Sequence, residues 1–132
     1  MSRVSTLVLF DIDGTLLGTG GAGKVALNQA FEATFGIAGA FDGVSFVGSM
    51  DCKLFNSASQ RHLGRAFTSE EETAFIEQYV TCLTNEFNHR PFEVYEGVLD
   101  TLRNLTADSS VVLGIATGNL EKAAWALSLI HI

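Results

Sequence analysis

The sequence predicts an α/β fold in which a long helical insert separates two parallel strands. Residues 4–10 and 111–116 have the length and apolar composition of buried strands, and each run ends in small polar residues. The second run is continuously apolar, which is typical of a central parallel strand buried on both faces. About seventy residues with helical character lie between the runs, too many for a simple crossover. We therefore expect a helical unit beside the sheet.

The composition is that of a globular protein. The 132 residues are 47% hydrophobic and 17% charged, which suits one modest domain with a core. Fifteen acidic and eight basic residues give a net charge of −7 without a basic stripe, which argues against a nucleic-acid partner. Cys52 and Cys82 form no metal-binding pattern. No run approaches the ~20 apolar residues of a membrane span, so we expect a cytoplasmic protein with no membrane partner.

The insert contains three predicted helices. Residues 24–35 carry apolar side chains on one stripe, and Gly36 is a natural stop after them. Residues 38–50 are rich in Gly and Phe and are predicted to be a loop. Asp51 is placed to cap a second helix over residues 51–63.

The third helix has the strongest signal. Thr68 and Glu71 fit a capping box, in which each residue satisfies a backbone N–H of the other, and Ser69 with Glu72 offers a second register. Apolar side chains then recur at spacings of three and four, which indicates a face packed in the core. These side chains are Phe75, Ile76, Tyr79, Val80, Leu83 and Phe87. Pro91 ends the pattern, and residues 97–105 form a short helix before the second strand.

Two carboxylates follow the first strand. Side chains at i and i+2 of an extended segment leave on the same face, so Asp11 and Asp13 point together from its carboxyl end. Open α/β sheets bind ligands at that edge. Gly14 lets the backbone turn and approach a ligand closely. Such a pair can hold a hard cation and supply a nucleophile and an acid/base, although Asp-Gly also occurs in ordinary turns.

The second strand ends in Thr117, Gly118 and Asn119, and a helix is predicted to follow. A hydroxyl and backbone N–H groups at a helix N-terminus suit an anion. The plainer interpretation is that Asn119 only caps that helix.

Residues 11–16, Asp-Ile-Asp-Gly-Thr-Leu after an apolar strand, resemble the first signature of the haloacid dehalogenase-like (HAD) superfamily, and the later Thr-Gly-Asn resembles the second. The resemblance covers about residues 6–125. It implies a Rossmann-like parallel sheet core with an inserted helical cap, as in the subgroup containing phosphoglycolate phosphatase and β-phosphoglucomutase. The expected core consists of residues 1–17 and 92–126, and the cap of residues 18–91.

The resemblance also implies Mg²⁺-dependent hydrolysis of a small phosphorylated metabolite, with phosphoglycolate as the leading candidate. Asp11 would attack phosphorus to form an aspartyl-phosphate, and Asp13 would act as acid and then base. Mg²⁺ would be held by the Asp11 carboxylate and the Asp13 backbone carbonyl. The residues implied in phosphate binding are Gly14, Thr117, Gly118 and Asn119.

Two further features of the insert bear on substrate binding. Residues 48–51, Gly-Ser-Met-Asp, lie where many relatives carry a Gly-x-Thr-Asp-like segment, with Met50 in place of Thr. The insert also contains cations able to contact an anionic tail of the substrate, although solvated positions are the simpler interpretation of each. They are Arg61, Arg65 and Arg90.

Three alternative functions remain. The first is a phosphosugar mutase like β-phosphoglucomutase. The second is an NTP-binding module, because residues 18–24 nearly spell a Walker A loop, although Val25 replaces its metal-binding hydroxyl. The third is an inactive fragment, because HAD enzymes need a later Lys and a later acidic pair. Beyond Thr117 the charged residues are Glu121 and Lys122, in the helix that directly follows.

The C-terminus leads to a related expectation. Two strands are too few for a doubly wound sheet, and a further ~80 to 100 residues are expected for such a core with a cap. Residues 127–132, Leu-Ser-Leu-Ile-His-Ile, match one reading frame of a transposase adapter used in sequencing libraries. We therefore expect them to be a non-native tail, with a natural apolar helix end as the alternative. We also expect little or no phosphatase activity from this chain, and activity from a version extended with its natural C-terminus.

Overall fold

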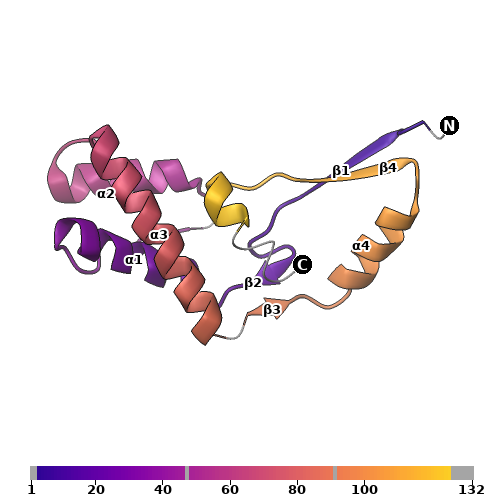
Figure 1. The fold of residues 1–132 in the computed structure, drawn as a ribbon, viewed down its shortest axis with the longest axis horizontal. Helices are drawn as coiled ribbons and strands as arrows, with labels where there is room; N and C mark the ends of the chain where they lie inside the picture. The colour runs from indigo at the N-terminus through magenta and orange to yellow at the C-terminus, as the bar shows by residue number, and fades with distance from the viewer. Residues whose placement is uncertain (1–2, 47, 91, 126–132) are drawn as a thin grey trace.

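The computed structural model describes residues 3–46, 48–90 and 92–125. Its elements in chain order are β1 (Thr6–Phe10), β2 (Leu17–Gly18), α1 (Ala22–Phe35), α2 (Asp51–Leu63), α3 (Ser69–His89), β3 (Glu93–Val94), α4 (Val98–Ala107) and β4 (Val111–Ile115). Residues 121–125 are also helical. Helices α1, α2 and α3 gather on one side of the molecule, and β1, β4 and α4 lie on the other (Figure 1).

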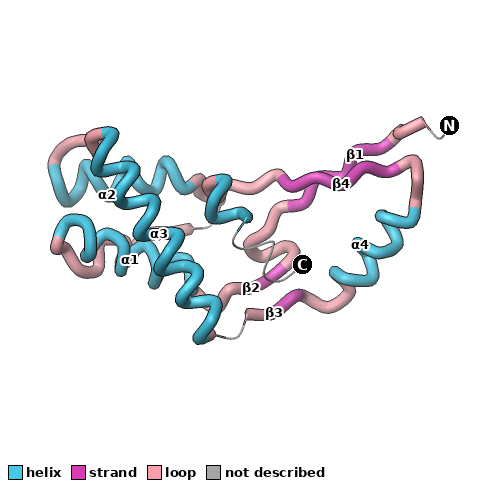
Figure 2. Tube along the Cα trace, viewed as in Figure 1, coloured by secondary structure: helices cyan, strands magenta, loops and turns pink. Residues whose placement is uncertain are grey.

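β1 and β4 form the parallel pair that defines the α/β class. Thr6 lies opposite Val111, and Phe10 lies opposite Ile115. The N–H of Ala116 donates to the Phe10 carbonyl at 2.8 Å, which continues the pairing to the point where the polar residues begin. The carboxyl ends of both strands therefore lie at the same edge. The mixed fold, with helices inserted between two parallel strands, is as the sequence predicts (Figure 2).

A second, antiparallel pair was not predicted. β2 and β3 align Leu17 with Val94 and Gly18 with Glu93. Each strand is two residues long, which is too short to show the alternation from which strands are predicted. This pair lies where the chain passes from the strands to the helices and where it returns (Figure 2). The two crossings are therefore side by side.

Helices α1, α2 and α3 enclose most of the hydrophobic core. Phe31 of α1 and Phe75 of α3 are fully buried, and their ring centroids are 5.9 Å apart in an edge-on contact. The ring of Phe55 in α2 meets the ring of Phe75 edge-on, with 4.9 Å between centroids. The ring of Phe41 stacks on that of Phe75, with 6.3 Å between centroids. The side chains of α3 that are buried agree with the predicted core face. They are Phe75, Tyr79, Leu83 and Phe87.

The ends of these helices follow from their own sequences. Gly36 and Gly64 end α1 and α2 with φ of 72° and 70°, in the left-handed region that favours glycine. The predicted capping box begins α3, because the Thr68 hydroxyl accepts the Glu71 N–H and the Glu71 carboxylate accepts the Thr68 N–H. Helix α1 begins at Ala22, two residues before the predicted start.

The prediction that the second strand is buried on both faces is wrong for the described residues. Val112 and Ile115 of β4 are 44% and 49% exposed, and Leu7 and Leu9 of β1 are also exposed. Each strand has one hydrogen-bonded neighbour in the described chain, and α4 packs against β4. Much of the apolar surface of this pair therefore faces solvent. The prediction failed because an apolar composition indicates a preference for burial, but does not show which elements cover the strand.

Three predictions concern the remaining parts of the chain. Within the described ranges, no helix combines the length and apolar character that crossing a membrane requires. The predicted break at Pro91 and the predicted tail at residues 127–132 lie outside the described residues.

The start of α3 leads to a prediction about stability in acid. Arg65 donates two hydrogen bonds of 2.8 Å to the Glu71 carboxylate, and these, with the Thr68 N–H, lower the Glu71 pKa from 4.5 to about 2. The ionised carboxylate therefore stabilises the fold above pH 4.5, and this contribution is lost as the pH falls towards 2. We expect Glu71→Gln to lower the melting temperature at pH 7, and this difference to shrink below pH 4.5, as measured by circular dichroism.

Glu72→Gln is the matched control, because it removes the neighbouring charge and leaves the Arg65–Glu71 pair in place. An equal loss in both variants at every pH would contradict the assigned cause.

Candidate functional site

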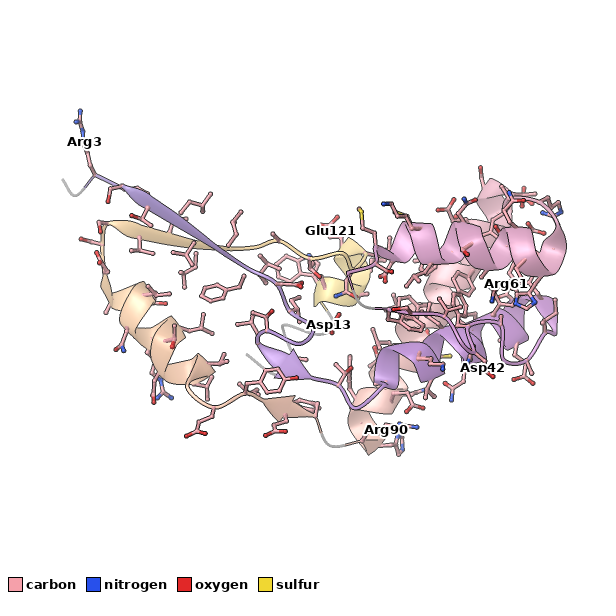
Figure 3. The ribbon with its side chains drawn as sticks, turned by 180° about the vertical axis from the view of Figure 1, so that it is seen from behind. Arg3, Asp13, Asp42, Arg61, Arg90 and Glu121 are labelled. Carbon is pink, nitrogen blue, oxygen red and sulfur yellow. The ribbon has the colours of Figure 1, made fainter. Side chains whose placement is uncertain are left out.

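A pocket of about 850 Å³ opens where the carboxyl ends of β1 and β4 face α1, α2 and α3. Figure 3 shows Asp13 between the strands and the helices. All six predicted site residues line this one pocket, although they come from two segments far apart in the sequence. They are Asp11, Asp13, Gly14, Thr117, Gly118 and Asn119.

The turn after β1 presents both carboxylates to the pocket. Ile12 is fully buried, while Asp11 and Asp13 on either side of it are exposed. Gly14 has a φ of 74°, and its N–H donates to the Leu17 carbonyl at 3.0 Å, which turns the chain back. Gly14 thus contributes backbone shape, and its own N–H is already bonded within the turn. In the described chain neither carboxylate joins an ion pair, so both have oxygens available to a ligand.

Asn119 links the ends of the two strands. Its side-chain amide donates to the Asp13 carboxylate at 2.7 Å and to the Thr117 hydroxyl oxygen at 2.8 Å. The backbone N–H of Asn119 also donates to that hydroxyl oxygen, at 3.2 Å. Because Thr117 accepts in both bonds, its own hydroxyl proton is left for another acceptor. Asn119 therefore orients Asp13 and Thr117 relative to each other.

Asp51 is the pocket residue whose role the sequence did not predict correctly. It is the first residue of α2 and does not cap that helix. Its carboxylate instead accepts the Leu120 N–H at 2.8 Å, just before helical residues 121–125, and its own N–H donates to the Gly118 carbonyl at 2.9 Å. A carboxylate at that position satisfies an N–H that has no partner within the helix. Asp51 thus caps a helical turn from the other side of the molecule.

Gly118 makes this contact between the helices and the strands possible. A Cβ added at Gly118 would lie 2.7 Å from the Ser49 carbonyl oxygen and 3.3 Å from the Met50 Cα. A side chain at this position would therefore push the two segments apart. The close approach of Gly118 to Ser49 and Met50 places residues 48–51, the Gly-Ser-Met-Asp segment, in the lining of the pocket.

The pocket is acidic and partly buried. Asp51 is 6% exposed, and its pKa is raised by burial, lowered in part by the Leu120 hydrogen bond, and raised further by Asp13. Tyr79 of α3 lines the same pocket at 2% exposure, and burial, Asp51 and Asp13 all raise the pKa of its phenol. Tyr79 therefore stays neutral at physiological pH. An anionic ligand would meet three carboxyl groups here, so it needs a cation beside it.

The donor set suits a hard cation such as Mg²⁺. Mg²⁺ is commonly bound through one or two carboxylates, with water and substrate phosphate completing its coordination. Asp11 lines one edge of the pocket and could supply such a carboxylate, with the backbone carbonyl of Asp13 as a second oxygen ligand. In the part of the chain that the structure describes, no group of three or more His, Cys, Asp or Glu residues is placed to hold a metal.

Among the described Lys and Arg side chains of α1, α2 and α3 and their connections, only Lys24 lines the pocket. None of the three arginines suggested by the sequence is among the described residues that line the pocket. Arg65 pairs with Glu71, and Arg90 pairs with Glu86. Figure 3 places Arg61 at the end of the helices far from Asp13. Lys24, in the first turn of α1, does line the pocket, whereas the sequence had suggested it only as part of a Walker A-like loop.

Comparison with known proteins identifies a family and a solved structure with a similar fold. The sequence matches the model of haloacid dehalogenase-like hydrolases over residues 8–129. The structure is similar to the crystal structure of a predicted phosphoglycolate phosphatase from Haemophilus somnus 129pt, with a TM-score of 0.57 and 21% identity. The match covers 92% of this chain and 55% of that protein, so this chain spans about half of its length. At this identity the likeness shows the fold alone. Among curated proteins, none matches the sequence.

The contact between Asp51 and Leu120 leads to a prediction about stability. Asp51→Ala leaves the part-buried Leu120 N–H without its acceptor, which is expected to lower the free energy of unfolding by about 1–3 kcal/mol. Asp51→Asn keeps an acceptor oxygen and is expected to lose less. Urea unfolding followed by fluorescence measures both changes.

Asp100→Ala provides the control, because Asp100 is an exposed acid in the first turn of α4. If Asp51→Ala and Asp100→Ala cost the same stability, the cap across the two parts makes no special contribution.

Proposed function

The chain belongs to the haloacid dehalogenase-like hydrolase family, and we propose that its pocket hydrolyses phosphate monoesters through an aspartyl-phosphate, with Mg²⁺ as the cofactor. One observation carries this proposal. Asp11 and Asp13, after β1, share a pocket with Thr117 and Asn119, after β4, and Asn119 bonds directly to Asp13. A nucleophile, an acid/base and a donor for phosphate are thereby brought together.

Asp11 is the proposed nucleophile. One of its carboxylate oxygens accepts the Ile12 N–H at 2.8 Å, which orients the group and leaves the other oxygen available. Attack on phosphorus forms a bond between that oxygen and the phosphoryl group, while the bond from phosphorus to the ester oxygen breaks. This divides one difficult displacement into two steps.

Asp13 is the proposed acid and base. It donates its proton to the departing ester oxygen, and then takes a proton from the water that attacks the aspartyl-phosphate. That second step releases inorganic phosphate and restores the Asp11 carboxylate. The bond from Asn119 holds Asp13 through one oxygen, so the other oxygen can carry the proton.

Thr117 is the proposed side-chain donor to the phosphoryl group. Its oxygen already accepts two bonds from Asn119, so its proton is directed elsewhere, and backbone N–H groups near Gly118 add to the site. When bound at Asp11 and the Asp13 carbonyl, Mg²⁺ neutralises charge on the phosphoryl oxygens. Two of the six residues differ in role from the initial expectation: we propose that Asn119 acts by orienting Asp13 and Thr117, and Gly14 by turning the backbone.

We propose a small phosphorylated metabolite as substrate, with phosphoglycolate first. Two observations support this choice. The similar fold from Haemophilus somnus is named a predicted phosphoglycolate phosphatase, and the pocket of about 850 Å³ is bounded by helices as well as strands. Of the Walker A-like residues 18–24, Gly18 belongs to β2 and residues 22–24 form the first turn of α1, with Gly21 (φ of 84°) at its N-cap.

The test is release of inorganic phosphate from phosphoglycolate in the presence of Mg²⁺. The 132-residue chain and any longer product of its gene are both assayed. Asp11→Asn is expected to reduce turnover to background, because it removes the nucleophile, and Asp13→Asn to lower kcat by about 10²- to 10⁴-fold. Chelation with EDTA is expected to stop turnover, and added Mg²⁺ to restore it.

Asp100→Asn is the control, because it removes an exposed carboxylate on α4, outside the pocket. Turnover by Asp11→Asn at the wild-type rate would disprove the aspartyl-phosphate mechanism.

A further inference from the structure

The balance of charge in the pocket singles out one side chain. Three carboxyl groups line it, from Asp11, Asp13 and Asp51. Among the described residues, Lys24 is the only lysine or arginine that lines the same space. We propose that Lys24 binds a second anionic group of the substrate, so that the site selects compact phosphate esters that also carry a carboxylate or another phosphate. This inference rests on the proposed function.

Lys24 reaches the pocket from a different element than the residues of the proposed chemistry. Asp11 and Asp13 come from the strand side, whereas Lys24 comes from the first turn of α1 on the helical side. With a phosphoryl group at Asp11, the rest of the substrate would share the pocket with residues of the helices. The described side chains that share this part of the lining are mainly apolar, among them Leu27, Phe46 and Leu54. Lys24 is thus the group there that favours a negative charge.

The present partner of Lys24 holds it weakly. The Lys24 ammonium is 4.0 Å from a carboxylate oxygen of Asp42, and the two side chains are 41% and 69% exposed. Exposed ion pairs of this kind contribute little stability. That oxygen of Asp42 also accepts a hydrogen bond of 2.9 Å from Asn28, so Asp42 keeps a partner when Lys24 turns away. The ammonium can therefore exchange Asp42 for a substrate anion at small cost.

A matched pair of ligands tests this inference. Phosphoglycolate carries a carboxylate, and 2-hydroxyethyl phosphate has a neutral hydroxymethyl group in its place. Binding of each is measured by calorimetry with Mg²⁺ present, in the Asp13→Asn background, where turnover is slowed and the Asp11 carboxylate and the backbone carbonyl of residue 13 are kept to hold the metal. Lys24→Gln is expected to weaken phosphoglycolate binding by about tenfold, because a charge-assisted contact is lost. It is expected to leave 2-hydroxyethyl phosphate binding unchanged.

Two further variants complete the experiment. Lys53→Gln makes the same charge change at an exposed position on α2 that does not line the pocket, and is expected to affect neither ligand. Lys24→Arg keeps the charge and is expected to retain most of the preference for phosphoglycolate. Equal weakening of both ligands by Lys24→Gln, no weakening of either, or no binding of phosphoglycolate at all would overturn the inference.

Failure of the proposed function gives a different result. If phosphoglycolate binds in a Lys24-dependent way but the wild-type protein releases no phosphate, the hydrolase proposal fails and the anion site at Lys24 remains. If the wild-type protein releases phosphate but Lys24→Gln changes the binding of both ligands equally, the hydrolase proposal stands and the anion site at Lys24 is disproved.

Discussion

The parallel register of β1 and β4 is the constraint on which the site depends. Phe10 pairs with Ile115, and the Ala116 N–H bonds back to the Phe10 carbonyl, so both polar segments leave the sheet at one edge. An antiparallel pair would place these segments at opposite ends. The bond between Asn119 and Asp13 joins residues 106 positions apart, and it exists because of this register. The chemistry proposed for the pocket is therefore a consequence of how two short strands align.

The helices are tied to that same edge. Asp51 bonds to Leu120 through its carboxylate and to Gly118 through its backbone N–H, and the absence of a side chain at Gly118 allows the close approach. These contacts lie next to Asn119, which orients Asp13. Movement of α2 away from the strands would break hydrogen bonds to the segment that positions the proposed acid. The geometry of the site and the placement of the helices above it are thus coupled.

The sequence predicted what is encoded locally. The capping box of Thr68 and Glu71 and the glycine stop after α1 involve adjacent residues, so local rules were enough. The role of Asp51 depends on a partner 69 positions away, and a local capping rule assigned it to α2. The two-residue strands β2 and β3 are too short for a periodic pattern. The exposure of β4 was missed because its composition cannot report which layers cover it. The six residues singled out from the sequence line one pocket, and the fold determined how they are connected.

Charge explains how a phosphate could bind in a pocket whose charged side chains are mostly acidic. The protein carries a net charge of −7, so its overall field repels an anion. Asp11, Asp13 and Asp51 add local negative charge, and Tyr79 stays neutral beside them. On the proposed function, phosphate affinity must then depend on a cation held by Asp11 and Asp13, and by linkage a bound phosphate must tighten that cation equally. Acidic residues therefore suit this site, because a phosphate ester can bind there only when the Mg²⁺ proposed for its hydrolysis is also bound.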